Sequence, residues 1–136
     1  IPALGHSNFK IEDGTMEFGV GHHGEAGTKV EKLKSASEMA QEIAETILND
    51  FDFEEGKEVA VMLSSLGATP VMELYVLYDE VEKVLAKAGH KVWKTYIGNY
   101  VTSLDMNGAS LTIVDLDDEI KELLSEPAVP IGMKNY

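Results

Sequence analysis

The sequence contains no cysteine and no arginine. Without cysteine, the chain forms neither disulfides nor thiolate metal sites. Without arginine, it lacks the side chain that grips a phosphate group through two parallel hydrogen bonds. It also has no apolar run close to the ~20 residues of a membrane-spanning helix, and no signal peptide is visible. These absences argue against a membrane protein and against a chain that holds a nucleotide alone, and they favour the cytoplasm.

Negative charge dominates the residues that are present. The chain carries 24 acidic residues against 11 lysines, a formal net charge of −13. Nucleic acid is not expected as a partner, because phosphate backbones are bound by clustered lysine and arginine. The 136 residues, 44% of them hydrophobic, suffice for one domain with a core. Since the sequence opens IPALGH, without methionine, we expect a piece of a longer protein.

The first part of the chain predicts a hairpin. Residues 8–12 and 16–21 are typical of two short strands, and Asp13-Gly14 between them is a strong turn signal. Residues 28–34 are interpreted as a polar, lysine-rich connector. The hairpin predicts that part of the sheet is antiparallel.

Helices and strands alternate in the rest of the chain. EVAVMLSS (58–65) is a near-continuous apolar run, typical of a strand buried on both faces. Three helices are predicted: one from Ser35 to residues 49–53, with a capping box from Glu38; one from Pro70 to Ala88, capped by Thr69; and one capped by Asp117 and stopped by Pro127. Two further strands are predicted at residues 91–97 and 109–116. The pattern predicts one α/β domain over residues 1–136, with a mixed sheet, an antiparallel N-terminal hairpin and about three helices.

Residues 19–27, GVGHHGEAG, concentrate glycine and histidine in one loop. A zinc site from His22, His23 and Glu25 is one interpretation, but neighbouring residues on an extended chain point in opposite directions, so we assign no metal. A phosphate cradle is another, yet the lysine and hydroxyl of a P-loop are missing. Two interpretations stay open: a tight bend with incidental histidines, or a reactive histidine that its glycine neighbours leave open to a small substrate.

Three segments together resemble one family. GVGHHGEAG is similar to a G-x-G-I-H-G-E-P-G loop, LGATPVMELY to a G-(G/A)-T-P-L-M-E-L-Y segment, and GNYVTSLDMNGASLTIVDLDDE to G-x-Y-M-T-S-L-E-M-A-G-x-S-(I/L)-T-L-L-K-L-D-D-E. These motifs belong, in the same order, to the K subunit of dihydroxyacetone (glycerone) kinases. The resemblance covers residues 16–119 and implies that the chain is the C-terminal half of such a subunit.

The resemblance implies a role for His23, the histidine before Gly-Glu. In the family this residue binds the carbonyl carbon of a short-chain ketose, such as dihydroxyacetone, through a ring nitrogen, so His23 is the expected catalytic and substrate-binding residue. A neutral imidazole that adds to a ketone gives a hemiaminal, and it has no second hydrogen to lose to form an imine. Glycerol has no carbonyl group, so the same chemistry excludes it.

The resemblance also implies partners. A nucleotide-binding L domain or subunit is expected to hold ATP-Mg or ADP-Mg, with no cofactor on this chain, and the full K subunit is expected to form a homodimer. The family's first half, with its GGGSGHEP-type segment and acid-base residues, is not found here, so the chain alone is expected to be inactive. A non-catalytic ketose sensor that co-activates transcription is the alternative function.

Several residues of these motifs have structural interpretations. Ala26 stands where the family has proline, and His22, where it has an aliphatic residue, is expected to be exposed without a role. Tyr75 and Tyr78 are predicted to pack in the core. The residues that either approach the site or serve in turns and caps are Thr102, Ser103 and Asp105.

Overall fold

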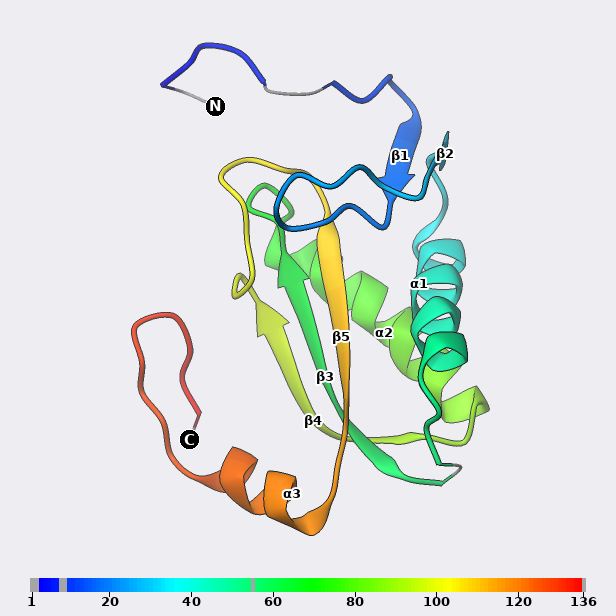
Figure 1. The fold of residues 1–136 in the computed structure, drawn as a ribbon, viewed down its shortest axis with the longest axis vertical. Coiled ribbons are helices and arrows are strands. Elements are labelled where there is room, and N and C mark those ends of the chain that lie inside the picture. Colours follow the sequence, from blue (N-terminus) through cyan, green and yellow to red (C-terminus); the bar gives the residue numbers. More distant parts are fainter. Residues whose placement is uncertain (1–2, 8–9, 55, 136) are drawn as a thin grey trace.

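Strand β3 (Glu58–Ser65) is the centre of a three-stranded sheet in the computed structural model, which describes residues 3–7, 10–54 and 56–135 (Figure 1). Strand β4 (Lys91–Gly98) runs parallel to β3 on one side, and β5 (Ala109–Asp115) runs antiparallel on the other. Six of the eight residues of β3 are buried. The mixed sheet and the buried central strand are therefore confirmed.

Helices α1 (Ala36–Asp50) and α2 (Val71–Lys87) pack against one face of this sheet (Figure 1). Helix α2 connects β3 to β4, since two parallel strands need a crossover between them. Alternate residues of β3 point toward the helices, and together they form the core. One cluster of fully buried residues within this core consists of Ala40, Val59, Val61, Val81 and Leu85. None of the helices in the described ranges is long and apolar enough to cross a membrane.

Two of the predicted helix caps are confirmed. At the start of α1, Ser35 Oγ accepts a hydrogen bond from Glu38 N–H at 3.3 Å, and Glu38 Oε2 accepts one from Ser35 N–H at 2.9 Å. At the start of α3 (Asp118–Ser125), Asp117 Oδ1 accepts from Ile120 N–H at 2.7 Å. Each bond satisfies a backbone N–H group that has no partner within its helix.

The cap predicted at Thr69 is wrong. Helix α2 begins at Val71, with Pro70 as the N-cap residue and no side-chain cap. The Thr69 hydroxyl instead donates to the carbonyl oxygen of Gly108 at 2.8 Å. Because this bond joins the loop before α2 to the loop before β5, the hydroxyl is used in tertiary structure and not in capping.

The antiparallel hairpin is present, but its strands are not the predicted pair. Strand β1 (Thr15–Phe18) pairs with β2 (Lys29–Lys32), which lies within the segment interpreted as a connector. Of the predicted strand 8–12, residues 8–9 lie outside the described residues, and residues 10–12 are not in a strand. The predicted pairing is therefore wrong, although the predicted N-terminal antiparallel hairpin itself is confirmed.

The turn at Asp13-Gly14 has a different partner from the one expected. Gly14 adopts a φ of +73°, so the chain does turn there. Its carbonyl oxygen, however, accepts a hydrogen bond from Leu33 N–H at 2.8 Å and so extends the β1–β2 pairing. Strand β2 contains one apolar residue, Val30, among charged ones, which left no alternation for sequence analysis to detect.

We expect Ser35→Ala to destabilise the protein by about 1 kcal/mol, because it removes the hydroxyl that accepts from Glu38 N–H at 3.3 Å and donates to Glu38 Oε2 at 2.6 Å. Ser35→Asp should restore most of the loss, since aspartate caps equally well. Chemical denaturation of the three proteins measures both effects. Equal stability of the alanine variant and the wild type would contradict a role for the capping box.

Candidate functional site

The histidine loop, residues 19–27, is the connection of the β1–β2 hairpin. Two hydrogen bonds close its neck: Thr28 N–H donates to the Phe18 carbonyl at 2.8 Å, and Gly27 N–H donates to Glu17 Oε1 at 2.7 Å. Nearer the tip, Gly21 N–H donates to the Glu25 carbonyl at 3.0 Å. The loop is therefore folded on itself.

Gly21 and Gly24 show why the loop needs glycine. A Cβ atom at Gly21 would lie 2.2 Å from Oε2 and 2.7 Å from Cβ of Glu25, so only glycine leaves room for this side chain. Gly24 has a φ of +90°, a region that L-residues with side chains rarely adopt. The glycines make the bend tight and let Glu25 fold back over the backbone.

The ring of His23 stands in solvent at the tip of this bend, with its side chain 92% exposed. Its backbone N–H donates to Glu25 Oε2 at 2.9 Å, and its Nδ1 lies 4.0 Å from Glu25 Oε1. His22 is also exposed, as predicted. The imidazole of His23 is therefore reachable by a small molecule, with a carboxylate on one side.

The histidine loop lies at the end of the molecule where β3 and β4 finish (Figure 1). In open α/β sheets, ligands bind beyond the carboxyl ends of the parallel strands. The loops 66–70 and 99–108 leave the sheet at this same end. The position of the hairpin therefore agrees with a ligand site, independently of the identity of its residues.

The other two motif segments bind each other. The Leu66 carbonyl accepts hydrogen bonds from Ser103 Oγ at 2.5 Å and from Met106 N–H at 3.2 Å. Ser64 Oγ accepts from the backbone N–H groups of Tyr100 at 2.9 Å and Val101 at 3.0 Å. The Ser103 hydroxyl thus holds two loops together, which agrees with its structural interpretation.

The two tyrosines of α2 differ in environment. Tyr78 is half-buried, its hydroxyl lies 2.9 Å from Thr95 Oγ1, and burial raises the pKa of its phenol. Its predicted packing role is confirmed. Tyr75 is 57% exposed, so the same prediction for it is wrong. It lies on the outward face of α2 with other exposed apolar residues, Val71, Met72 and Val76.

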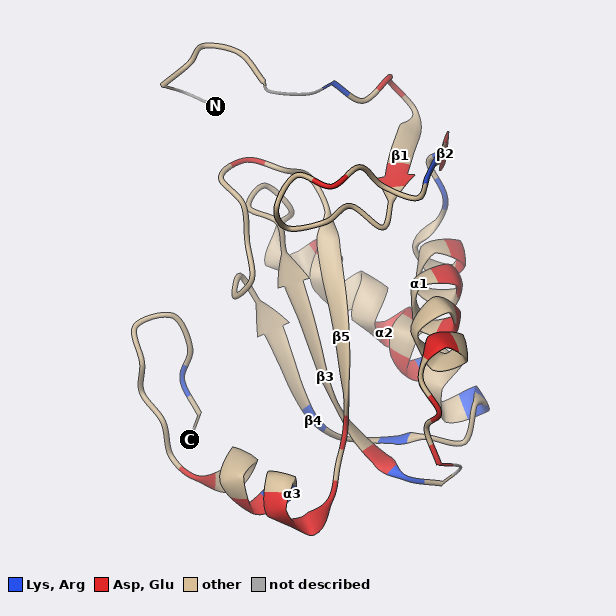
Figure 2. Ribbon diagram, in the orientation of Figure 1, with Lys and Arg blue, Asp and Glu red and all other residues tan. Residues whose placement is uncertain are grey.

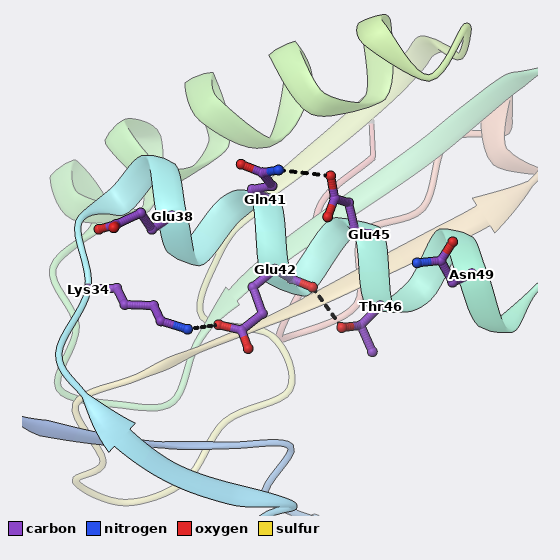
Figure 3. A pocket seen from close by; sticks show the side chains of 7 residues that line it. All are labelled: Lys34, Glu38, Gln41, Glu42, Glu45, Thr46 and Asn49. Atoms are coloured by element: carbon purple, nitrogen blue, oxygen red, sulfur yellow. Dashed lines mark hydrogen bonds and ion pairs between the residues drawn. The ribbon is translucent and has the colours of Figure 1, made fainter.

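Charged side chains join the hairpin to α1. Lys29 of β2 and Lys34, which follows β2, both form ion pairs with Glu42 of α1, the latter at 2.5 Å. Acidic residues recur along α1 in Figure 2. Figure 3 shows a shallow groove there, in which Lys34 points toward Glu42. The groove contains no residue of the histidine loop.

Among residues 3–7, 10–54 and 56–135, no group of three or more His, Asp or Glu side chains is arranged to hold a metal ion. His22, His23 and Glu25 therefore form no such cluster, although they are close in sequence.

Sequence analysis missed the roles of two carboxylates. It considered Glu25 only as a metal ligand, and it gave Glu17 no role. Glu17 fixes the neck of the loop through Gly27, and Glu25 fixes the backbone of His23. The signal available in the sequence was the two-residue spacing of His23 and Glu25, which allows a carboxylate to bind a backbone N–H group close to it.

The fold and the site together define a class of protein: an α/β domain that presents an exposed histidine on a glycine-rich hairpin. A family model for the Dak1 domain matches residues 1–131. The chain belongs to the Dak1 domain family, which confirms the resemblance to the K subunit.

Three known proteins show the extent of the similarity. The dihydroxyacetone-binding subunit DhaK of PTS-dependent dihydroxyacetone kinase 2 from Listeria innocua is 38% identical over 127 residues, which cover 93% of this chain and 38% of that protein. D-erythrulose kinase from Mycolicibacterium smegmatis is 37% identical, over 94% of this chain and 22% of the enzyme. A solved structure of the dihydroxyacetone kinase operon co-activator Dha-DhaQ has a TM-score of 0.83 at 30% identity, over 90% of this chain and 38% of that one. The chain thus spans little more than a third of the Listeria subunit.

The ion pairs of Glu42 predict how stability depends on pH. Hydrogen bonds from Lys29 and Lys34 lower the pKa of the Glu42 carboxyl from 4.5 to about 2. A carboxyl with a lowered pKa in the folded state stabilises the protein above its unfolded pKa, and this contribution disappears as the pH falls toward the folded value. We expect the difference in unfolding free energy between the wild type and Glu42→Gln to be constant near neutral pH and to shrink below about pH 5.

Denaturant titrations at several pH values measure this difference. Glu45→Gln is the matched control, because the Glu45 carboxylate on the same helix accepts its hydrogen bond from the neutral amide of Gln41, where Glu42 has charged lysines. A difference for Glu42→Gln that stays the same at acidic and neutral pH would contradict the proposed ion-pair contribution.

Proposed function

We propose that this chain is the ketose-binding part of a dihydroxyacetone-type kinase. It holds dihydroxyacetone, or a related short-chain ketose such as erythrulose, as a covalent hemiaminal on His23. The exposed imidazole at the tip of the Dak1 hairpin is the observation that carries the proposal. The names of the relatives support the substrate class, since they include a dihydroxyacetone-binding subunit and a D-erythrulose kinase.

The chemistry requires a neutral ring nitrogen and a ketone. The nitrogen lone pair forms a bond to the carbonyl carbon, the carbon–oxygen π electrons move to oxygen, and oxygen gains a proton while the ring loses one. A neutral imidazole is available near pH 7, unlike the amine of an ordinary lysine. Covalent attachment selects ketoses over polyols, and it fixes the terminal hydroxyl for transfer of a phosphoryl group.

The phosphoryl donor belongs to a partner in this proposal. A nucleotide-binding L domain or subunit supplies the phosphoryl group from ATP-Mg or ADP-Mg, and the complete K subunit is a homodimer. The absence of arginine supports this division, because the chain lacks the side chain that clamps phosphate through two parallel hydrogen bonds. The chain alone would therefore bind ketose without phosphorylating it.

A ketose sensor is the second candidate, and one observation favours it. The dihydroxyacetone kinase operon co-activator has a closely similar structure, with a TM-score of 0.83. Both candidate functions use the same histidine. A kinase and a sensor are therefore distinguished by parts of the family's sequence that lie outside these 136 residues. Sequencing the gene beyond these residues separates the two functions. The presence of the family's acid-base residues, or of an L partner, favours the enzyme, and their loss favours the sensor.

We expect dihydroxyacetone labelled with ¹³C at its carbonyl carbon to give a signal of a tetrahedral, nitrogen-bound carbon in the NMR spectrum of this protein. His23→Ala should abolish the signal, and His22→Ala, the matched control, should retain it. Lysines form imines with ketones, and borohydride traps imines, so the measurement uses no reductant. A signal that persists in His23→Ala would contradict the covalent proposal.

Ketose affinity should depend on the rest of the family's pocket. We expect the 136-residue chain to bind dihydroxyacetone at least tenfold more weakly than a chimera in which these residues replace the matching segment of the Listeria DhaK. The chain supplies the histidine, and the chimera adds hydrogen bonds to the substrate hydroxyls. Titration calorimetry compares the two proteins, and equal affinities would show that the histidine loop is sufficient.

A further inference from the structure

We infer that Glu25 is a positioning residue for His23. Its carboxylate keeps the ring proton on Nδ1, which leaves the lone pair of Nε2 free, and it stabilises the positive charge that the ring gains when Nε2 adds to a ketone. The second part of this inference rests on the proposed function. The first part, the location of the proton, does not.

Both carboxylate oxygens of Glu25 face the same residue. Oε2 accepts a hydrogen bond from the backbone N–H of His23 at 2.9 Å, and Oε1 lies 4.0 Å from Nδ1 of the ring. The backbone bond holds the carboxylate in place, so its second oxygen stays beside the ring. At 4.0 Å the two groups are farther apart than in a hydrogen bond, so the carboxylate acts on the ring through its charge.

The loop is built around this arrangement. Gly21 N–H donates to the Glu25 carbonyl at 3.0 Å, which fixes the backbone of Glu25 at the tip. The space that a Cβ atom at Gly21 would fill is taken by the Glu25 side chain, whose Oε2 would lie 2.2 Å from it. The position of the carboxylate is therefore determined by the loop and not only by the choice of a surface rotamer.

The addition step explains why a carboxylate matters here. When Nε2 forms its bond to the ketone carbon, the ring becomes an imidazolium and the carbonyl oxygen becomes an alkoxide. The oxygen then takes a proton from water, and Nδ1 releases its own proton to water, so the net change moves one proton from Nδ1 to oxygen. A carboxylate beside Nδ1 attracts the cation while it exists. It also fixes the tautomer, because a ring nitrogen keeps its proton when an acceptor faces it.

Glu17 provides a matched comparison within the same hairpin. Its Oε1 accepts a hydrogen bond from Gly27 N–H at 2.7 Å, at the neck of the loop. The two carboxylates thus each hold one backbone N–H group. Glu25 differs from Glu17 in that its second oxygen lies beside the His23 ring. Glutamine at either position keeps an oxygen acceptor for the backbone bond and removes the charge.

The test reads the tautomer of His23 from the ¹⁵N chemical shifts of its two ring nitrogens, in the protein without ketose. A free histidine side chain carries its neutral proton mostly on Nε2. We expect the wild type to carry it mostly on Nδ1, Glu25→Gln to lower the ratio of the two tautomers at least threefold, and Glu17→Gln to leave it unchanged. An unchanged ratio in Glu25→Gln, or an equal change in Glu17→Gln, would overturn the inference.

A second measurement follows the rate of hemiaminal formation with ¹³C-labelled dihydroxyacetone, with His23→Ala as the background. We expect Glu25→Gln to slow the rate about fivefold, the size of one exposed ion pair. An unchanged rate would overturn the role of Glu25 in the addition while the proposed function stands. Absence of the adduct in the wild type would overturn the proposed function and the addition step together, and the tautomer measurement would still decide the location of the proton.

Discussion

The Glu25 side chain fills the space that a Cβ atom at Gly21 would take, and the arrangement of the histidine loop depends on this close approach. Any Cβ atom at Gly21 would overlap the carboxylate, so the carboxylate could no longer reach the backbone N–H of His23. With glycine there, the loop turns sharply and directs the ring outward, where 92% of the His23 side chain is exposed. Glycine at position 21 thus leaves room for the carboxylate that binds the backbone of His23 and lies beside its ring.

The two parts of the molecule are held by different forces. The sheet and its helices share a core of fully buried aliphatic side chains, whose removal from water dominates folding energetics. The hairpin contributes none of the buried residues of this core and is joined to α1 by ion pairs from Lys29 and Lys34 to Glu42. These pairs lie near the surface, with the Lys29 and Lys34 side chains 47% and 28% exposed. Surface ion pairs stabilise by about 0–1 kcal/mol each, so they hold the hairpin more weakly than the buried core holds the sheet and helices.

Sequence patterns predicted the elements that depend on local or periodic signals. The buried run of β3, the reciprocal bonds of Ser35 and Glu38, and the Asp117 cap are all present, because each follows from neighbouring residues alone. The pairing partner of β1 was wrong because Asp13-Gly14 turns the chain without joining two strands, and because β2 has a single apolar residue. Thr69 was misassigned because its hydroxyl bonds to Gly108, a contact 39 residues away in sequence.

The glycine and histidine content of residues 19–27 singled out the loop, motif resemblance gave His23 its expected role, and the geometry came only from the structure. The sequence predicted a reachable imidazole in a bend, which is what the loop presents. It did not reveal the fold of Glu25 over Gly21, since that contact depends on backbone angles that no periodicity encodes. Tyr75 was misassigned because helical spacing from Leu74 does not define the edge of a buried face, and its side chain lies outside it.

The most direct test of the account is a crystal structure of this protein with dihydroxyacetone at high concentration. The account predicts continuous electron density between Nε2 of His23 and the former carbonyl carbon, with that carbon tetrahedral. An intact ketone held only by hydrogen bonds, or a ketose bound to a lysine with the His23 ring untouched, would contradict it.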